Sequence, residues 1–230
     1  FRRVLFRSKK SSWGINYGYT NLDLAFAIIK QKQDYSKTPT YHNADANFRI
    51  KTSNTGILKY YGYFSSNKLA FTSNSIDSIG YLDKFAIGNT NFYHNLAWKE
   101  NIGKKWKVNA GVSYTNNKDD INSSMQDQNK NDVVLSGLEG KKFQVDTKGD
   151  YFNAKLVLER RLKGLSSIRF GSEYNYSKDR LVYTDYNEQQ YPGNLSESIN
   201  SVFAEADIYI TNKLAAKTGA RPVLDRKSVV

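Results

Sequence analysis

At five places along the chain, two segments of alternating apolar and polar residues are joined by a very short turn, and longer polar stretches separate these pairs. The clearest pair sets Phe92, Leu96 and Trp98 against Trp106 and Val112. A period of two places successive side chains on opposite faces of an extended strand, so each segment predicts a β-strand with one apolar and one polar face. The pattern predicts an all-β fold, an antiparallel meander of about ten long strands.

The five predicted hairpins share a tight turn between two alternating segments. They pair residues 13–19 with 22–28, 44–50 with 58–64, 90–98 with 106–114, 154–162 with 168–176, and 202–210 with 214–220. In the first hairpin, a two-residue turn at Thr20 and Asn21 would place Tyr19 opposite Leu22. All apolar residues of that pair would then meet apolar partners on one face.

The predicted strands are unusually long, and their connections alternate. Roughly 9–11 residues cross a bilayer when a strand is tilted by about 45°, whereas strands of soluble proteins average about 5–6 residues. All tight turns fall at one end of the predicted strands and all long loops at the other, which is typical of a transmembrane β-barrel. The long loops run from about residue 31 to 43, 67 to 84, 116 to 148, and 177 to 198.

Aromatic residues lie near both ends of the predicted strands. Trp98 and Trp106 flank one tight turn, while Tyr114, Tyr174 and Tyr176 lie toward the loop ends. In a membrane barrel these five side chains would form the lipid-facing aromatic girdles, and the charged face would border a hydrated interior. The charged face carries both signs, at Asp45, Arg49, Lys51, Glu159, Arg161, Arg169, Glu173, Glu205 and Asp207. We expect these charges to pair between strands.

The composition agrees with such a fold. Mean hydropathy is −0.65, because alternating strands average out to polar, and the chain has no Cys with which to form a disulfide. The net charge of +12 could indicate a nucleic-acid partner. Half of that charge lies in residues 1–10 and 222–230, however, and the rest is scattered, so we expect no nucleic-acid binding.

The two ends break the alternation beside them. We expect residues 1–10 and 222–230 to be foreign or artefactual tails, and residues 11–221 to be a partial outer-membrane β-barrel, an internal fragment of a longer protein.

Motifs for catalysis or cofactor binding are not found in the sequence, so we expect neither an enzyme nor a cofactor. His94 shares the parity of Phe92 and Leu96, which places it on the apolar face. His42 is predicted in a loop beside Asp45, without further partners for a metal.

Two hairpins resemble those of a known family. Residues 201–221 (SVFAEADIYITNKLAAKTGAR) and 98–114 (WKENIGKKWKVNAGVSY) are similar to barrel hairpins of TonB-dependent outer-membrane receptors, especially those of Bacteroidetes. The resemblance implies a bacterial outer-membrane location, a 22-stranded barrel with a plug domain, and coupling to TonB. It also implies energised uptake of a scarce, bulky nutrient such as an iron chelate, cobalamin or a glycan. In such receptors the loops select the ligand, and Tyr183, Tyr186 and Tyr191 could stack on it.

Three other functions fit the same alternation. The first is an outer-membrane enzyme on a complete ten-stranded barrel, and the second is a passive porin-like channel. The third is a soluble β-sandwich or β-solenoid binding module, in which the apolar face would point toward a protein core.

Overall fold

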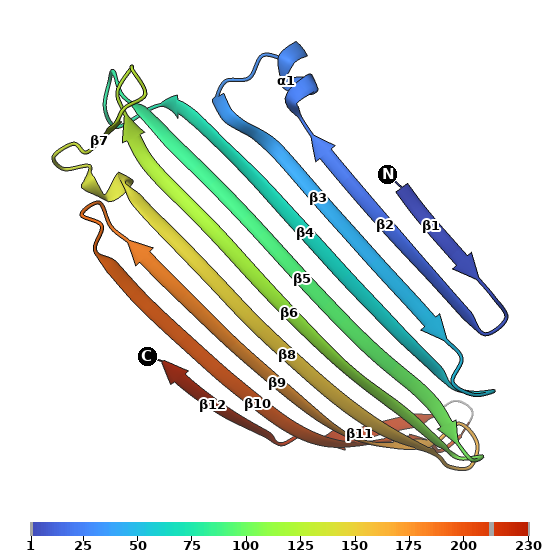
Figure 1. Ribbon diagram of the computed structural model, residues 1–230. Coiled ribbons are helices and arrows are strands. Elements are labelled where there is room, and N and C mark those ends of the chain that lie inside the picture. The colour runs from blue at the N-terminus through green and yellow to red at the C-terminus, as the bar shows by residue number, and fades with distance from the viewer. Residues whose placement is uncertain (1, 212–213, 230) are drawn as a thin grey trace.

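A computed structural model describes residues 2–211 and 214–229, and places all their strands in one sheet of 12 strands (Figure 1). The strands are β1 (Arg2–Arg7), β2 (Ser11–Asn21), β3 (Asp34–Ile50), β4 (Ile57–Asn74), β5 (Leu82–Ile102), β6 (Trp106–Gln126), β7 (Asp132–Val133), β8 (Phe143–Arg161), β9 (Ser167–Thr184), β10 (Gln190–Tyr209), β11 (Ala215–Ala220) and β12 (Val223–Val229). Two short helices, α1 (Asp23–Ile28) and η1 (Glu139–Lys141), lie in connections. No helix among the described residues is long and apolar enough to span a membrane.

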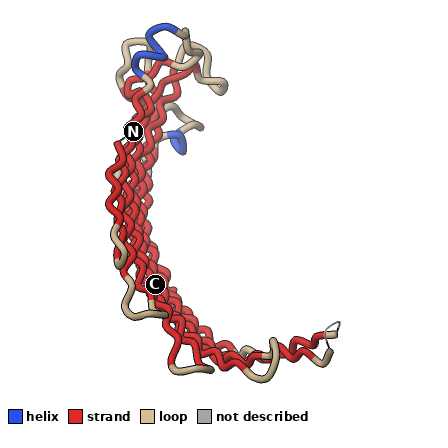
Figure 2. The backbone as a smooth tube through the Cα atoms, turned by 90° about the vertical axis from the view of Figure 1, so that its right-hand side faces the viewer, coloured by secondary structure: helices blue, strands red, loops and turns tan. Residues whose placement is uncertain are grey.

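The sheet is an antiparallel meander. Its main path runs β1-β2-β3-β4-β5-β6-β8-β9-β10-β11, with β7 added to β6 and β12 added to β10. Nothing in the described part of the chain pairs the first strand with the last, so the sheet is open. Seen from the side, it curves strongly (Figure 2). These features confirm the predicted all-β antiparallel meander.

The tight turns lie at one end of the sheet, as the sequence predicts, and they join β3 to β4, β5 to β6, β8 to β9, and β10 to β11 (Figure 1). The β5–β6 turn contains Gly103, whose φ is +62°. Glycine reaches this left-handed region without the steric cost that a Cβ atom adds, so the turn can close within three residues.

The first predicted hairpin is wrong. Residues Asp23–Ile28 form α1, and the apolar residues of β2 face β3, where Ile15 lies opposite Ala46 and Trp13 opposite Phe48. Asn21 turns the chain, because its side-chain oxygen accepts a hydrogen bond from the Asp23 backbone N–H at 2.7 Å. Such local side-chain bonds compete with strand pairing.

Strands β3 to β6 and β8 to β10 are also about twice as long as predicted, with 17–21 residues each. Strands β5 and β6 each have 21 residues, and residues predicted to lie in loops, including most of 116–126, continue the ladder. Beyond the alternating segments both faces carry polar residues, so the hydrophobic period disappears while the backbone hydrogen bonds continue. Four of the predicted long loops are therefore reduced to short connections or to the segment with β7 and η1.

The predicted tails also take part in the sheet. Strand β1 pairs with β2 and strand β12 pairs with β10, so the regular backbone extends into both ends of the chain. Their foreign origin stays a prediction.

Candidate functional site

The two faces of the sheet differ in an unusual way. Val112 and Tyr114 on the apolar face of β6 are each 41% exposed, whereas the intervening Ser113 and Thr115 on the polar face are less exposed. In a soluble sheet the apolar side chains are the sheltered ones. Exposed apolar side chains also lie on this face of β5, β8, β9 and β10, although Val108 of β6 is buried at 5% and, on β4, Tyr61 of the polar face is 40% exposed.

The exposed apolar residues form a continuous band, here called the apolar belt. It consists of apolar side chains that point to the same face of the sheet. These are the odd-numbered ones within 13–19 of β2 and the even-numbered ones within 44–50 of β3, 58–64 of β4, 92–98 of β5, 106–114 of β6, 152–158 of β8, 168–176 of β9 and 202–208 of β10. In β6 and in β9 the belt covers eight residue steps, or about 26 Å along the strand at about 3.3 Å per residue.

The belt crosses the sheet obliquely. Following the register from strand to strand, Tyr19 of β2 lies in line with Asn194 of β10. The first belt residue of β10 is Val202, eight residues nearer the tight turns. Eight residues over seven strand spacings of about 4.8 Å correspond to a strand tilt of about 40° from the normal of the belt. Strands of membrane barrels tilt by about 35–45°.

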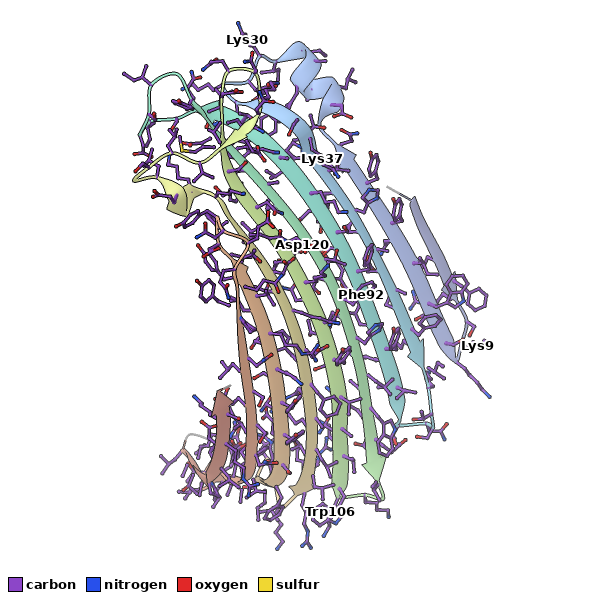
Figure 3. The ribbon with its side chains drawn as sticks, turned by 60° about the vertical axis from the view of Figure 1, so that its left-hand side comes forward. Lys9, Lys30, Lys37, Phe92, Trp106 and Asp120 are labelled. Carbon is purple, nitrogen blue, oxygen red and sulfur yellow. The ribbon has the colours of Figure 1, made fainter. Side chains whose placement is uncertain are left out.

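Aromatic residues end the belt on the loop side, and we call this edge the aromatic margin. It steps through Tyr19, Phe64, Phe92, Tyr114, Phe152 and Tyr176. In Figure 3 Trp106 lies at the tight-turn end, Phe92 farther along the strands, and Asp120 beyond it toward the loops.

All five predicted girdle residues lie on the belt face. Tyr114 and Tyr176 belong to the aromatic margin, and Tyr174 lies one step inside it. They do not lie at loop ends, because β6 continues for 12 residues beyond Tyr114. Trp98 and Trp106 lie toward the tight turns, where the Arg160 guanidinium stacks 5.5 Å from the Trp106 ring centroid.

Both histidines lie on the belt side and share one arrangement. The Tyr17 hydroxyl hydrogen-bonds His42 Nδ1 at 2.8 Å, and the Tyr60 hydroxyl hydrogen-bonds His94 Nδ1 at 2.7 Å. His94 has the predicted orientation. His42 lies within β3 rather than in a loop, which corrects the sequence prediction. Each pair satisfies a polar group on an otherwise apolar surface, as such groups require.

The polar face carries salt bridges between neighbouring strands, as predicted. Arg169 of β9 contacts Glu159 of β8 at 3.2 Å and Asp207 of β10 at 3.1 Å. Glu173 contacts Lys155 at 3.3 Å and, on its other side, Arg221 at 3.0 Å. Within the described residues, Asp45, Arg49, Lys51 and Arg161 form no salt bridge, and Asp45 instead accepts a hydrogen bond from Asn16 at 2.8 Å. Opposite charges on adjacent strands stabilise the sheet.

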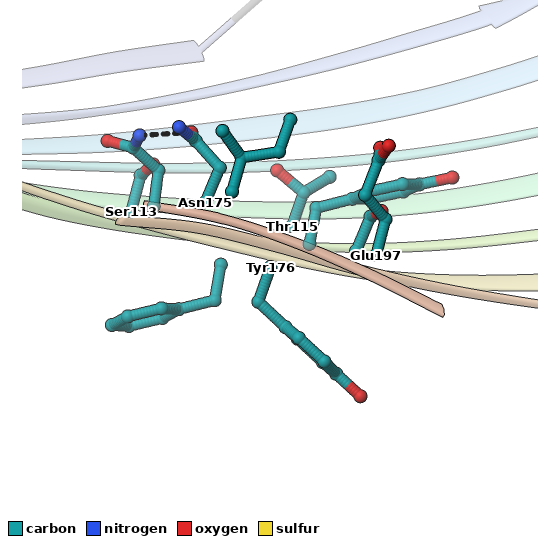
Figure 4. Close-up of a pocket in the computed structure, with 10 residues that line it drawn as sticks. Ser113, Thr115, Asn175, Tyr176 and Glu197 are labelled. Atoms are coloured by element: carbon teal, nitrogen blue, oxygen red, sulfur yellow. Dashed lines mark hydrogen bonds between the residues drawn. The ribbon is translucent and has the colours of Figure 1, made fainter. Parts of the chain in front are cut away.

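A shallow hollow lies on this polar face between β6, β8, β9 and β10. Ser113, Thr115, Asn175 and Glu197 project into it, whereas Tyr176 points to the opposite side of the sheet (Figure 4). Asn153 donates a hydrogen bond to Asn175 across the hollow. Its volume of about 240 Å³ is below the roughly 300–1,000 Å³ of typical ligand pockets. The hollow is therefore a shallow polar groove rather than an enclosed ligand site.

The three predicted ligand-contacting tyrosines lie together at the loop end, but only one is in a loop. Tyr183 belongs to β9 and Tyr191 to β10, and their ring centroids are 6.1 Å apart. Tyr186 lies in the short connection between these strands. The tyrosine group is thus held by the sheet, which fixes the two strand residues.

Sequence reasoning missed an apolar strip next to these tyrosines. On the polar side of the sheet, one register row contains Leu69, Ile87, Ile121 and Val145 and continues to Tyr183 and Tyr191. The signal was present as a change of parity. Apolar residues of β6 are even-numbered up to Tyr114, whereas Ile121 is odd-numbered.

Connections at the loop end are tied together by ion pairs. Lys141, the last residue of η1, binds the carboxylates of Asp77 and Asp83, the latter at 2.9 Å. These hydrogen bonds raise the pKa of Lys141 above its usual value. Lys130 contacts Asp34 at 2.7 Å. The segment between β6 and β8 is therefore fastened to β3 and to the β4–β5 connection.

Across the part of the chain that the structure describes, no group of three or more His, Cys, Asp or Glu side chains is arranged to hold a metal ion. The oxygen-rich residues 116–122 alternate between the two faces of β6, so they do not converge. No protein-family model matches the chain, and no curated protein matches it.

Proposed function

We propose that this chain forms part of the membrane-spanning wall of a TonB-dependent receptor in a bacterial outer membrane, which imports a scarce, bulky nutrient. The observation that carries the proposal is the apolar belt. It is largely exposed and it crosses the strands obliquely, while salt bridges line the opposite face.

The size and slope of the belt support burial in a bilayer. At a tilt of about 40°, its length of about 26 Å along β6 spans about 20 Å of the membrane normal, and the aromatic margin adds an interfacial edge. The backbone is fully paired within the sheet interior, as a hydrocarbon environment demands. A membrane sheet must also leave no strand edge with unpaired backbone groups. The curvature of the sheet supports this, because a curved sheet can close into a barrel with further strands.

A soluble binding module needs a second layer over the belt. Among the described residues no element packs on it, and Phe170 and Leu156 are each 46% exposed. An uncovered apolar surface of this extent favours aggregation in water. The membrane accounts for the same surface without an additional protein layer.

The proposal that the protein imports a nutrient is supported by the polar face and by the two hairpins, 98–114 and 201–221, that resemble the receptor family. Both hairpins form as the resemblance implies, between β5 and β6 and between β10 and β11. The paired charges around Arg169 and Glu173 suit a wall that borders water and a plug domain. Lipid, a plug domain, TonB and a small-molecule or glycan ligand are the partners that this function requires.

The absence of Cys makes a direct test of the belt simple. Single cysteines at Leu96 and Val112 can be spin-labelled in lipid vesicles and compared with Asn95 and Ser113, their neighbours on the other face. We expect the first set to collide with dissolved oxygen and the second set with a water-soluble nickel chelate. Uniform access of the nickel chelate to both sets would exclude membrane burial.

Transport has its own test. Cells that lack the gene carrying this sequence are compared with complemented cells for uptake of iron chelates, cobalamin and oligosaccharides. We expect loss of uptake of one class, and the complemented uptake should stop when a protonophore collapses the proton gradient. Uptake that is insensitive to the protonophore would identify a passive channel instead.

A further inference from the structure

Three cations stand side by side on the belt face, on the loop side of the aromatic margin. In the register, Lys118 of β6 lies directly opposite Lys148 of β8, which lies directly opposite Arg180 of β9. A fourth cation, Lys178, lies one step closer to the margin. Like charges directly opposite each other on neighbouring strands destabilise a sheet. An anion bound over this row would remove that cost.

The chain itself neutralises this group only in part. Lys118 contacts Asp120 at 3.4 Å and Arg180 contacts Asp150 at 3.4 Å, both longer than a good charged hydrogen bond. Lys148 and Lys178 form no salt bridge with any residue that the structure describes. Asp150 also accepts hydrogen bonds from the Tyr114 hydroxyl at 2.6 Å and from Asn116 at 2.8 Å, which divides its charge among several donors.

One further acid faces the group. Asp146 of β8 lies opposite Asp120 of β6, one step beyond the cation row. Burial, together with a hydrogen bond shared with Asp120, raises the pKa of Asp146. Asp120, Asp146 and Asp150 set three carboxyl groups against the four cations, so this patch keeps a net positive charge.

The position of the row matches the depth of lipid headgroups. Lys118 lies four residues beyond Tyr114, and Lys148 lies four residues beyond Phe152. At a tilt of about 40° this places the Cα atoms about 10 Å outside the hydrocarbon edge, where the polar headgroup layer lies. The Lys and Arg side chains can reach back toward the margin with their charged ends.

We propose that Lys118, Lys148, Lys178 and Arg180 bind the phosphate groups of a glycolipid in the outer leaflet, whose acyl chains lie against the apolar belt below. This inference rests on the proposed membrane location. Arg presents a planar donor pair that matches phosphate oxygens, and Lys adds a point charge, so the row suits an extended headgroup with more than one phosphate. The adjoining apolar surface of Phe152 and Tyr176 favours a lipid over a free anion.

The test uses the full chain in nanodiscs of phosphatidylcholine, with lipid A carrying two phosphates as the probe and dephosphorylated lipid A as its match. Binding is measured by native mass spectrometry. The test variant is K118Q/K148Q/R180Q. The control variant K59Q/K99Q/K107Q removes the same charge from the polar face, where these lysines form no salt bridge with described residues.

We expect the test variant to bind the two-phosphate lipid at least about tenfold more weakly than the wild type, as loss of charged hydrogen bonds implies. The control variant should bind the two-phosphate lipid like the wild type. The wild type and both variants should bind dephosphorylated lipid A equally. Equal binding by test and control variants would overturn the inference, as would displacement of the lipid by millimolar inorganic phosphate. Should the triple variant fail to fold, K148Q/K178Q removes the two cations without salt bridges and must show the same direction of change.

The two proposals fail in different ways. A protein that does not enter nanodiscs, or whose belt labels stay accessible to the nickel chelate, contradicts the membrane location itself. A protein that enters them with a lipid-exposed belt but ignores the phosphates of the probe contradicts only the glycolipid site.

Discussion

The guanidinium of Arg160 lies 5.5 Å from the ring centroid of Trp106, at the tight-turn side of the apolar belt. Trp106 is 37% exposed, so the pair lies at the surface. An exposed cation–π contact is worth about 0.5–1 kcal/mol. We expect Arg160→Gln to lower the free energy of unfolding in lipid by about that amount, and the same change in a Trp106→Leu background to cost nothing further. Urea unfolding in lipid vesicles measures both, and an equal cost in both backgrounds would show that the stacking is not responsible.

For the proposed membrane location, the slope of the belt predicts which residues share a depth. Spin labels at Tyr19→Cys and Val202→Cys should report equal depth from the ratio of oxygen to nickel-chelate collisions, although the residues are eight positions apart in register. A label at Asn194→Cys, in line with Tyr19, should lie about 20 Å farther out. Equal depth for positions 19 and 194 would mean that the strands stand upright rather than tilted.

The β5–β6 turn depends on the backbone of Gly103. Its φ of +62° is costly for a residue with a Cβ atom, although no atom would obstruct that Cβ within 4 Å. We expect Gly103→Ala to destabilise the protein by about 1 kcal/mol. Gly140→Ala is the control, because that glycine has no positive φ and equally open surroundings. Chemical unfolding of the two variants should separate them, and equal values would rule out backbone strain as the cause.

Gly171 is covered by an aromatic ring. The Phe203 ring, from the neighbouring strand β10, occupies the space that a Cβ atom at position 171 would enter. We expect Gly171→Ala to cost about 1–3 kcal/mol, as overpacking does. The cost should largely disappear in a Phe203→Ala background. Gly111→Ala serves as the control, since the nearest atom to its added Cβ is at 3.6 Å, an ordinary contact distance. A similar loss at both glycines would point to the backbone instead of the ring.

The pKa of Lys141 predicts a response to alkaline pH. Its bonds to Asp77 and Asp83 raise the pKa, so the fastening is complete below the unfolded-state value near 10.5 and is lost as the pH rises through the higher folded-state pKa. A spin label at Val134→Cys, in the β6–β8 segment, should become more mobile over that upper range. In a Lys141→Met background the label should be mobile at all pH values. A pH step that survives this substitution would arise from other groups.

The sequence was sufficient for the parts of the fold that an alternating pattern encodes. The shared face of Leu96, Val112 and Phe170 follows from the period of two, because successive side chains of a strand point to opposite faces. Four of the five predicted hairpins form on the same logic. The girdle residues lie on the predicted face for the same reason.

The rest was hidden for physical reasons. Leu24, Phe26 and Ile28 alternate as a strand does, and over six residues a helix and a strand cannot be separated by period, so the turn set by Asn21 decided the outcome. The outer halves of the strands, such as residues 116–126, have polar residues on both faces and no period to detect. Placement of Tyr183 and Tyr191 in loops failed for this reason.

The cation row could not be predicted from any single segment of the sequence. Lys118, Lys148 and Arg180 are distant in sequence, and only the register of β6, β8 and β9 places them in line. A displacement of one residue in either pairing would turn one of these side chains to the other face.

The slope of the belt limits how such a wall can change in evolution. Each strand is offset from its neighbour by slightly more than one residue, so removing one hairpin leaves the flanking strands out of step by about two residues, or about 7 Å. Deletions, duplications and chimaeras are thus tolerated only when the incoming hairpin carries the same offset. One hairpin of this sheet can therefore replace another when both have the same offset, and similarity of sequence alone does not tell which exchanges succeed.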